Sequence, residues 1–206
     1  TGTPLPAVFD PADESLSEIA GGTFASTASV TSTGDGRVAI VGGATSETAS
    51  RVDVVSEDSN GAVLLTSGIG ALRVARSAPS ALSIGAGRLV VTGGVVPSGG
   101  VTAGVEVVDL TGATASASLV ERERVRRSIR PIERLGDGRV LLAGGADPGG
   151  GASSRAFVFD PATNQVEEVG SLPEPLDGRR YTAPLPDGTA IVVGADASTD
   201  VRIFQP

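Results

Sequence analysis

The sequence of 206 residues contains no cysteine, no histidine, no methionine and no tryptophan. Without thiols or imidazoles it cannot form a disulfide, a Cys- or His-based metal site, a Cys nucleophile or a Ser-His-Asp triad. Lysine is also absent, so all 16 basic residues are arginines. Any catalytic chemistry would therefore fall to Asp, Glu, Arg, Ser or the single tyrosine, Tyr181.

Aromatic residues make up only 3% of the chain, although 40% of it is hydrophobic. The core must therefore consist of Val, Leu, Ile and Ala, and few rings remain on which a sugar could stack. The net charge is −8, which argues against nucleic acid or an anionic membrane as a partner, because phosphate binding requires a positive surface. No apolar run approaches the roughly 18 residues of a membrane-spanning helix, and no signal peptide is recognisable.

The length suits one sizeable domain, and the 29 glycines and 13 prolines suit many short strands joined by turns. A bias toward Arg, Ala, Gly and Val without Lys is typical of a GC-rich genome. The chain begins at Thr1 rather than at Met. From this we expect either a processed mature chain or a piece of a longer one.

A glycine followed by an apolar run returns four times, at Gly36, Gly87, Gly138 and Gly188. The copies are 51, 51 and 50 residues apart, and a constant period of this length indicates a repeat architecture. In each copy a Ser- and Ala-containing run leads through a Gly-rich or Asp-Gly turn into the apolar strand. A third strand is predicted some 20 residues later, and a more polar fourth strand follows it in the first three copies.

The unit is therefore predicted to be a sheet of four antiparallel strands, with repeats at about 21–68, 69–120, 121–172 and 173–206. Residues 7–10 and 16–20 add two strands in front of them. A small twisted sheet cannot bury both of its faces alone, so the copies must stack face to face. Radial stacking makes the predicted fold an all-β β-propeller, forming a single domain over residues 1–206.

At these residues the chain resembles the kelch-type repeat, whose period is near 50 and whose second strand ends in a Gly-Gly pair. The resemblance implies structural roles for seven glycines: Gly42, Gly43, Gly93, Gly94, Gly144, Gly145 and Gly194. Residues 158–164 (VFDPATN) are similar to the downstream family element, and Arg76 and Arg127 to its upstream arginine. The pattern looks most like divergent bacterial kelch repeats of secreted proteins, although the family's Trp and His are missing.

Copper oxidases that share the kelch fold use His ligands and a Cys–Tyr crosslink, so that activity cannot be carried over to any position here. The blade count leaves two alternatives. Residues 16–20 could supply the fourth strand of the last blade and close a four-bladed ring. The chain could instead be part of a larger propeller, whose open blade faces would associate.

The first candidate site is a ladder of arginines at the mouth of the propeller channel, able to hold a carboxylate or phosphate group. It comprises Arg73, Arg76, Arg124, Arg127 and Arg180. The alternative is a structural role in which each guanidinium binds loop carbonyls. We favour the structural role, because a residue repeated in every blade usually serves the repeat.

The sequence offers three further candidates. Residues 122–134 carry six arginines and could bind an acidic partner, or could be an exposed strand of alternating charge. The loops at 44–50, 95–104, 146–154 and 195–200 vary in sequence and could carry a binding site. Oxygen-rich loops could hold Ca²⁺, although none has the spacing of a Ca²⁺ loop; the acidic residues are Glu57, Asp58, Asp147, Asp196 and Asp200.

We expect a non-catalytic binding or scaffold module without a cofactor, which mediates protein–protein interaction or self-assembly outside the cell or at its surface. The repeat, the varied loops and the missing catalytic residue types favour this interpretation. The alternatives are a carboxylate-based hydrolase or lyase with its site at the channel mouth, and a carbohydrate-binding propeller. A strongly perturbed carboxylate facing Arg76 or Arg127 would favour the enzyme.

Overall fold

The computed structural model describes residues 7–19, 25–102, 104–121, 132–147, 149, 151–176, 180–194 and 201–204. Within these ranges the chain forms strands, turns and irregular connections but no helix, so it also contains no helix that could cross a membrane. The protein is therefore all-β. The sheets are antiparallel throughout.

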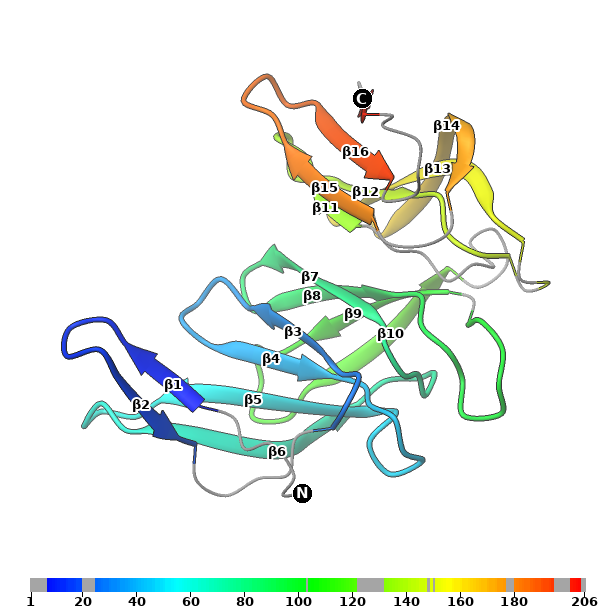
Figure 1. Ribbon diagram of the computed structural model, residues 1–206. Helices are drawn as coiled ribbons and strands as arrows, with labels where there is room; N and C mark the ends of the chain where they lie inside the picture. The colour runs from blue at the N-terminus through cyan, green and yellow to red at the C-terminus, as the bar shows by residue number, and fades with distance from the viewer. Residues whose placement is uncertain are drawn as a thin grey trace.

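Successive groups of strands form separate sheets in which each strand pairs with its neighbour in sequence (Figure 1). The N-terminal hairpin consists of β1 (Ala7–Asp10) and β2 (Ser15–Glu18). The first four-stranded sheet consists of β3 (Ser29–Ser32), β4 (Val38–Val41), β5 (Arg51–Glu57) and β6 (Val63–Ala71). The second consists of β7 (Ser80–Gly85), β8 (Arg88–Thr92), β9 (Val105–Asp109) and β10 (Ser116–Glu121).

The third four-stranded sheet consists of β11 (Ile132–Arg134), β12 (Val140–Ala143), β13 (Ser153–Asp160) and β14 (Gln165–Leu176). The last sheet has three strands, β15 (Arg180–Pro184), β16 (Ala190–Gly194) and β17 (Val201–Phe204). The predicted second and third strands are confirmed in every copy. The more polar fourth strands of the first three copies are present as β6, β10 and β14, and β6 and β14 each carry a register shift opposite the third strand of their sheet.

The second strands β8 and β12 are apolar on both sides because each of them lies between two other sheets. In β8, Leu89 and Val91 pack with the first sheet, whereas Val90 packs with the third. In β12, Leu142 packs toward the second sheet and Leu141 toward the last. Since alternate residues of a strand face opposite sides, a continuous apolar run is what a doubly covered strand requires.

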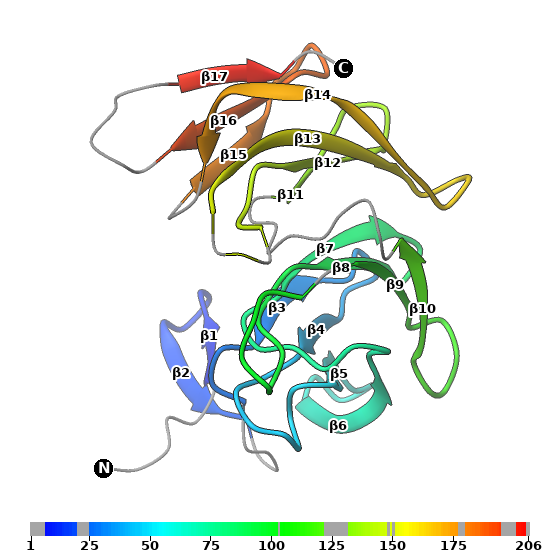
Figure 2. The same ribbon diagram turned by 90° about the vertical axis from the view of Figure 1, so that its right-hand side faces the viewer.

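The sheets follow one another face to face in chain order, and Figures 1 and 2 show this succession from two sides. Their first strands β3, β7, β11 and β15 are neighbours, and so are their fourth strands β6, β10 and β14. Three hydrophobic clusters fill the spaces between successive sheets. Most of the core is aliphatic, as the composition predicts, but the cluster between the second and third sheets also contains the buried rings of Phe157 and Phe159.

The two ends of this series do not meet. Strand β2 pairs with β1 in a separate two-stranded sheet, and the last sheet keeps three strands. Both views show β1–β2 and β17 far apart (Figures 1 and 2). The predicted donation of residues 16–20 to the last sheet, which would close a four-bladed ring, is therefore not formed. Strand β2 ends at Glu18, and within the described residues its strand partner is β1.

Candidate functional site

The glycine pairs lie where the backbone of one segment touches another. A Cβ on Gly42 would lie 2.6 Å from the carbonyl oxygen of Arg76, and one on Gly94 would lie 2.5 Å from that of Ser77. Both glycines also have positive φ, 77° and 95°, which side-chain-bearing residues rarely adopt. These two glycines thus allow the ends of β4 and β8 to pack directly on the backbone of Arg76 and Ser77, in the segment that leads into the second sheet.

Arg76 lies in that segment and is fully buried. Its guanidinium forms an ion pair with Glu106 and donates hydrogen bonds to the carbonyl oxygens of Val74 (3.1 Å), Gly93 (3.1 Å) and Gly104 (3.5 Å). Burial lowers the pKa of Arg76 below the usual guanidinium value, and the negative charge of Glu106 opposes this shift. All of these partners belong to one repeat, and the guanidinium has no surface exposed to a solute.

Glu106 receives three donors at this point, because it also accepts the backbone N–H groups of Arg73 (2.6 Å) and Val74 (3.1 Å). The sheet register places Asp53 at the equivalent position of the first sheet and Phe157 in the third. Asp53 is also buried, and its carboxylate accepts the guanidinium of Arg51 (2.9 Å) and the N–H of Gly68 (2.7 Å). The sequence pattern indicates neither Asp53 nor Glu106 as a candidate.

The other arginines of the predicted ladder do not join Arg76 within the described residues. The guanidinium of Arg73 donates to the carbonyl oxygen of Ala117 (2.8 Å), which ties the entry segment to the fourth strand of its own sheet. Arg180 begins β15, and only its backbone pairing with Gly194 is described. Arg124 and Arg127 lie outside the described residues. A ring of arginines around a channel therefore stays a prediction.

At the opposite end of the sheets, the turns between first and second strands carry ion pairs. The carboxylate of Asp35 binds the guanidinium of Arg37 (2.6 Å), which also donates to the carbonyl oxygen of Leu110 in the second sheet (2.9 Å). The hydrogen bond from Arg37, followed by that from the Thr33 hydroxyl, holds the pKa of Asp35 well below its usual range. This pair therefore connects two successive sheets.

Asp137 and Arg139 repeat the same pairing in the third sheet, with 2.6 Å between carboxylate and guanidinium. Partial burial by itself raises the pKa of Asp137. The N–H and guanidinium of Arg139 outweigh that effect and bring the pKa below the ordinary carboxyl value. The hydroxyl and N–H of Thr189 lower the pKa of Asp187 in the corresponding turn of the last sheet.

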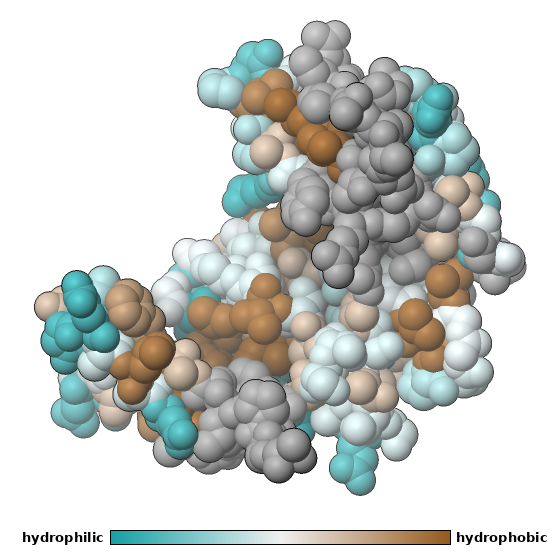
Figure 3. Space-filling model, viewed as in Figure 1, coloured by the Kyte–Doolittle hydropathy of each residue, from teal (hydrophilic) through white to brown (hydrophobic). Residues whose placement is uncertain are grey.

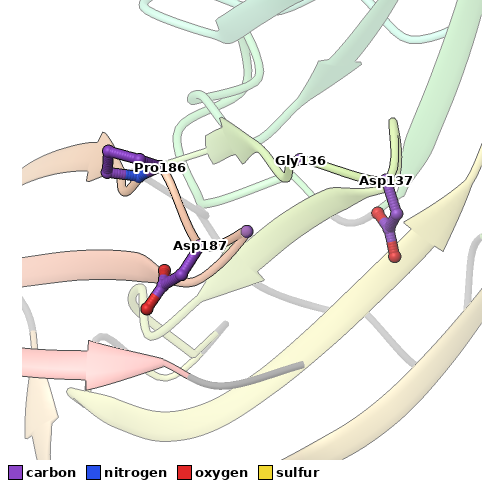
Figure 4. A pocket seen from close by; sticks show the side chains of 5 residues that line it. Gly136, Asp137, Pro186 and Asp187 are labelled. Atoms are coloured by element: carbon purple, nitrogen blue, oxygen red, sulfur yellow. The ribbon is translucent and has the colours of Figure 1, made fainter.

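A cavity of about 390 Å³ lies between these last two turns, lined by Gly136, Asp137, Pro186, Asp187 and Gly188. The turns approach closely, because a Cβ on Gly136 would lie 2.9 Å from the Cα of Gly188. Figure 4 shows the carboxylates of Asp137 and Asp187 on separate turns, and neither of them points toward the other. The cavity thus lacks the two converging carboxylates that a glycoside hydrolase uses.

A second cavity of about 230 Å³ lies between the second and third sheets. Three arginines line it: Arg88, Arg134 and Arg139. Arg134 belongs to the predicted Arg-rich stretch 122–134, of which residues 122–131 lie outside the described part of the chain. The remaining lining includes Asp137 and Asp160. Arg88 is not among the candidate residues that the sequence pattern predicts, although its position after the turn glycine matches Arg37 and Arg139.

The other predicted candidates are only partly described. Asp58 caps its own turn by accepting the N–H groups of Asn60 (2.8 Å) and Ala62 (2.9 Å), and Asp196 and Asp200 lie outside the described residues. Within the described ranges, no three His, Cys, Asp or Glu residues are grouped as metal ligands would be. The loops at 44–50 and 95–102 are described and contain hydrogen-bonded turns.

No protein-family model matches the chain, and no curated protein matches it either. Among solved structures the chain is similar to a fungal alcohol oxidase of the AA5 family in complex with copper, at 17% sequence identity and a TM-score of 0.78. The match covers 100% of this chain and 48% of the oxidase chain, so this chain spans about half the length of that neighbour. At this identity the likeness concerns the fold alone.

Proposed function

We propose that the chain is a non-catalytic binding or scaffold module that acts through protein–protein contact or self-assembly. We propose further that its sheets are consecutive blades of a kelch-type β-propeller. The order of the sheets supports this, because first strands adjoin first strands and fourth strands adjoin fourth strands along the series. The glycine pairs at the ends of the second strands support the kelch relationship.

The observation that carries the proposal is exposed apolar surface at the N-terminal end of the series of sheets. Phe9 on β1 and Leu16 on β2 are directly paired across the hairpin and are 56% and 72% exposed. Val30 on β3 is 62% exposed, on the face of the first sheet opposite the packed residues Ala39 and Val41. In Figure 3, apolar surface gathers at lower left, on the hairpin and beside it.

An interface that covered Phe9 and Leu16 would gain about 3 kcal/mol from their burial, or roughly a hundredfold in association constant. Large apolar side chains exposed together are typical of protein interaction sites. We place the module outside the cell or at its surface, by its resemblance to secreted kelch repeats. The copper chemistry of the structural neighbour is not extended to this chain, which has neither His nor Cys.

The test is the mass in solution, measured by light scattering over a range of concentrations. We expect the wild-type chain to exceed its monomer mass of 20.4 kDa. The double variant Phe9→Ser/Leu16→Ser should shift to the monomer, whereas Val169→Ser, which changes another exposed residue on β14, should not. A wild-type monomer at every concentration would refute self-assembly, and equal assembly of all three proteins would refute the role of this surface.

A further inference from the structure

Two of the arginines that line the 230 Å³ cavity are not held in an ion pair with any residue that the structure describes. Within the described residues, the guanidiniums of Arg88 and Arg134 form no ion pair and donate no hydrogen bond. Arg88 is half-buried and Arg134 is exposed. Both guanidinium groups are thus available at the cavity, in a chain whose net charge is −8.

The missing partner of Arg88 has a cause in the sequence. Arg37 and Arg139 occupy the same repeat position as Arg88, and each binds an aspartate two residues earlier in its own turn. In the second sheet that turn residue is Ala86, so Arg88 has no such partner. It interacts through space with Asp109, whose carboxylate accepts the hydroxyl (2.6 Å) and N–H (2.8 Å) of Thr111.

Arg134 has no counterpart in the other repeats. Its side chain extends from β11 toward the β7–β8 turn of the second sheet. Its guanidinium nitrogens lie 3.9 Å from the places that Cβ atoms on Gly85 and Gly138 would occupy. The missing side chains at both glycines leave the guanidinium beside the turn that leads into Arg88. The cavity therefore joins two cationic groups from successive sheets.

The acidic side chains at the cavity are already bound to other groups. Asp137 binds the guanidinium and N–H of Arg139, and Asp160 accepts the N–H of Ala162 (2.8 Å). Three arginines against two aspartates leave the lining with a net positive charge. Guanidinium groups bind phosphate and carboxylate oxygens strongly, because charge and planar donor geometry act together.

We propose that this cavity, between the β7–β8 turn and β11, is a binding site for the phosphate or carboxylate group of a small ligand, held by Arg88 and Arg134. The Arg139–Asp137 pair forms one wall and fixes the third guanidinium in place. Ile84, which is buried, adds an apolar side chain to the lining. The site is independent of the apolar surface at β1–β3.

Isothermal titration calorimetry of the full chain at low ionic strength tests the site, with inorganic phosphate and citrate as separate probes. We expect saturable binding of at least one probe, and the stronger probe identifies the preferred group. Arg88→Gln and Arg134→Gln should each weaken that binding about tenfold, which corresponds to ~1.4 kcal/mol. The control Arg155→Gln removes an arginine that pairs with Glu168 outside the cavity, and it should bind as the wild type does.

A further variant, Ala86→Asp, adds a carboxylate to the turn without removing an arginine, and it should also weaken binding. Thermal unfolding without ligand shows whether each variant is folded, and the two arginine variants report independently of each other. Failure of both probes to bind the wild type, or equal binding by wild type and both arginine variants, overturns the proposal. A loss in Arg155→Gln as large as in Arg134→Gln would show a general charge effect and would overturn it as well.

Discussion

The buried pair of Arg76 and Glu106 allows a sharp prediction about stability. Both side chains are fully buried, and the carboxylate also accepts the N–H groups of Arg73 and Val74. The substitution Glu106→Ala leaves a buried guanidinium without its counter-charge. Removal of one partner from a buried ion pair costs about 3–5 kcal/mol of unfolding free energy. For a chain of this length, that loss lowers the melting temperature by roughly 6–20 °C.

Glu106→Gln keeps the side-chain volume and separates charge from shape. Its amide oxygen can still accept from Arg76, but its NH₂ group then faces the N–H of Arg73, so two donors meet. We expect the unfolding free energy of Glu106→Gln to lie between that of the wild type and that of Glu106→Ala. The double variant Arg76→Met/Glu106→Leu should be more stable than Glu106→Ala, because no charge stays buried without a partner.

Urea denaturation followed by circular dichroism measures these differences as shifts of the midpoint. The matched control is Glu168→Ala, since Glu168 pairs with Arg155 at the surface, where both side chains are about 40% exposed. An exposed pair of this kind contributes about 0–1 kcal/mol. If Glu106→Ala costs no more than Glu168→Ala, the structural role of the Arg76–Glu106 pair is refuted. If Glu106→Ala does not fold, Glu106→Gln and the double variant still decide the question.

Two other substitutions test local features of the same fold. Gly94→Ala should lower the unfolding free energy by about 2–4 kcal/mol, because the new side chain combines a positive φ with a Cβ 2.5 Å from the carbonyl oxygen of Ser77. Gly99 also has positive φ, but open space surrounds it, so Gly99→Ala should lower the unfolding free energy by only about 1 kcal/mol. Urea denaturation measures both changes. The folded-state pKa of Asp35 lies below its ordinary value, so its contribution to stability is present above about pH 4 and is lost as the pH falls through the folded-state value. Asp35→Asn should therefore destabilise the chain at pH 7 and flatten the acid side of its stability–pH curve; an unchanged curve would contradict the assignment.

The strands could be predicted because their signals are local. Apolar runs such as Val38–Val41 and Val140–Ala143, each placed after a turn glycine, define doubly covered strands without any knowledge of the neighbours. The constant period then requires that the copies stack. The closure of the series could not be predicted in this way, because it depends on whether the free edge of β2 and the edge of the last sheet lie side by side. No local sequence signal reports the distance between two segments so far apart in the chain.

The partner of Arg76 was missed for a different reason. Arginines at 76 and 127 repeat at 51 residues, but the buried acids at the equivalent register position, Asp53 and Glu106, are 53 residues apart. The loop before the third strand varies in length, so the acid falls out of the period. Only the strand pairing aligns the two positions. In the third sheet this position holds Phe157, which has no carboxylate to bind an arginine.

Departures from the repeat therefore locate candidate sites better than the repeat itself does. Where the pattern is complete, each charge has a partner from its own repeat, as Arg37 has Asp35 and Arg139 has Asp137. Where Ala86 replaces the turn aspartate, Arg88 is left without that partner, and the non-repeated Arg134 lies at the same cavity. The physical account of both is an external anion, and the titration of the Arg88 and Arg134 variants measures it directly.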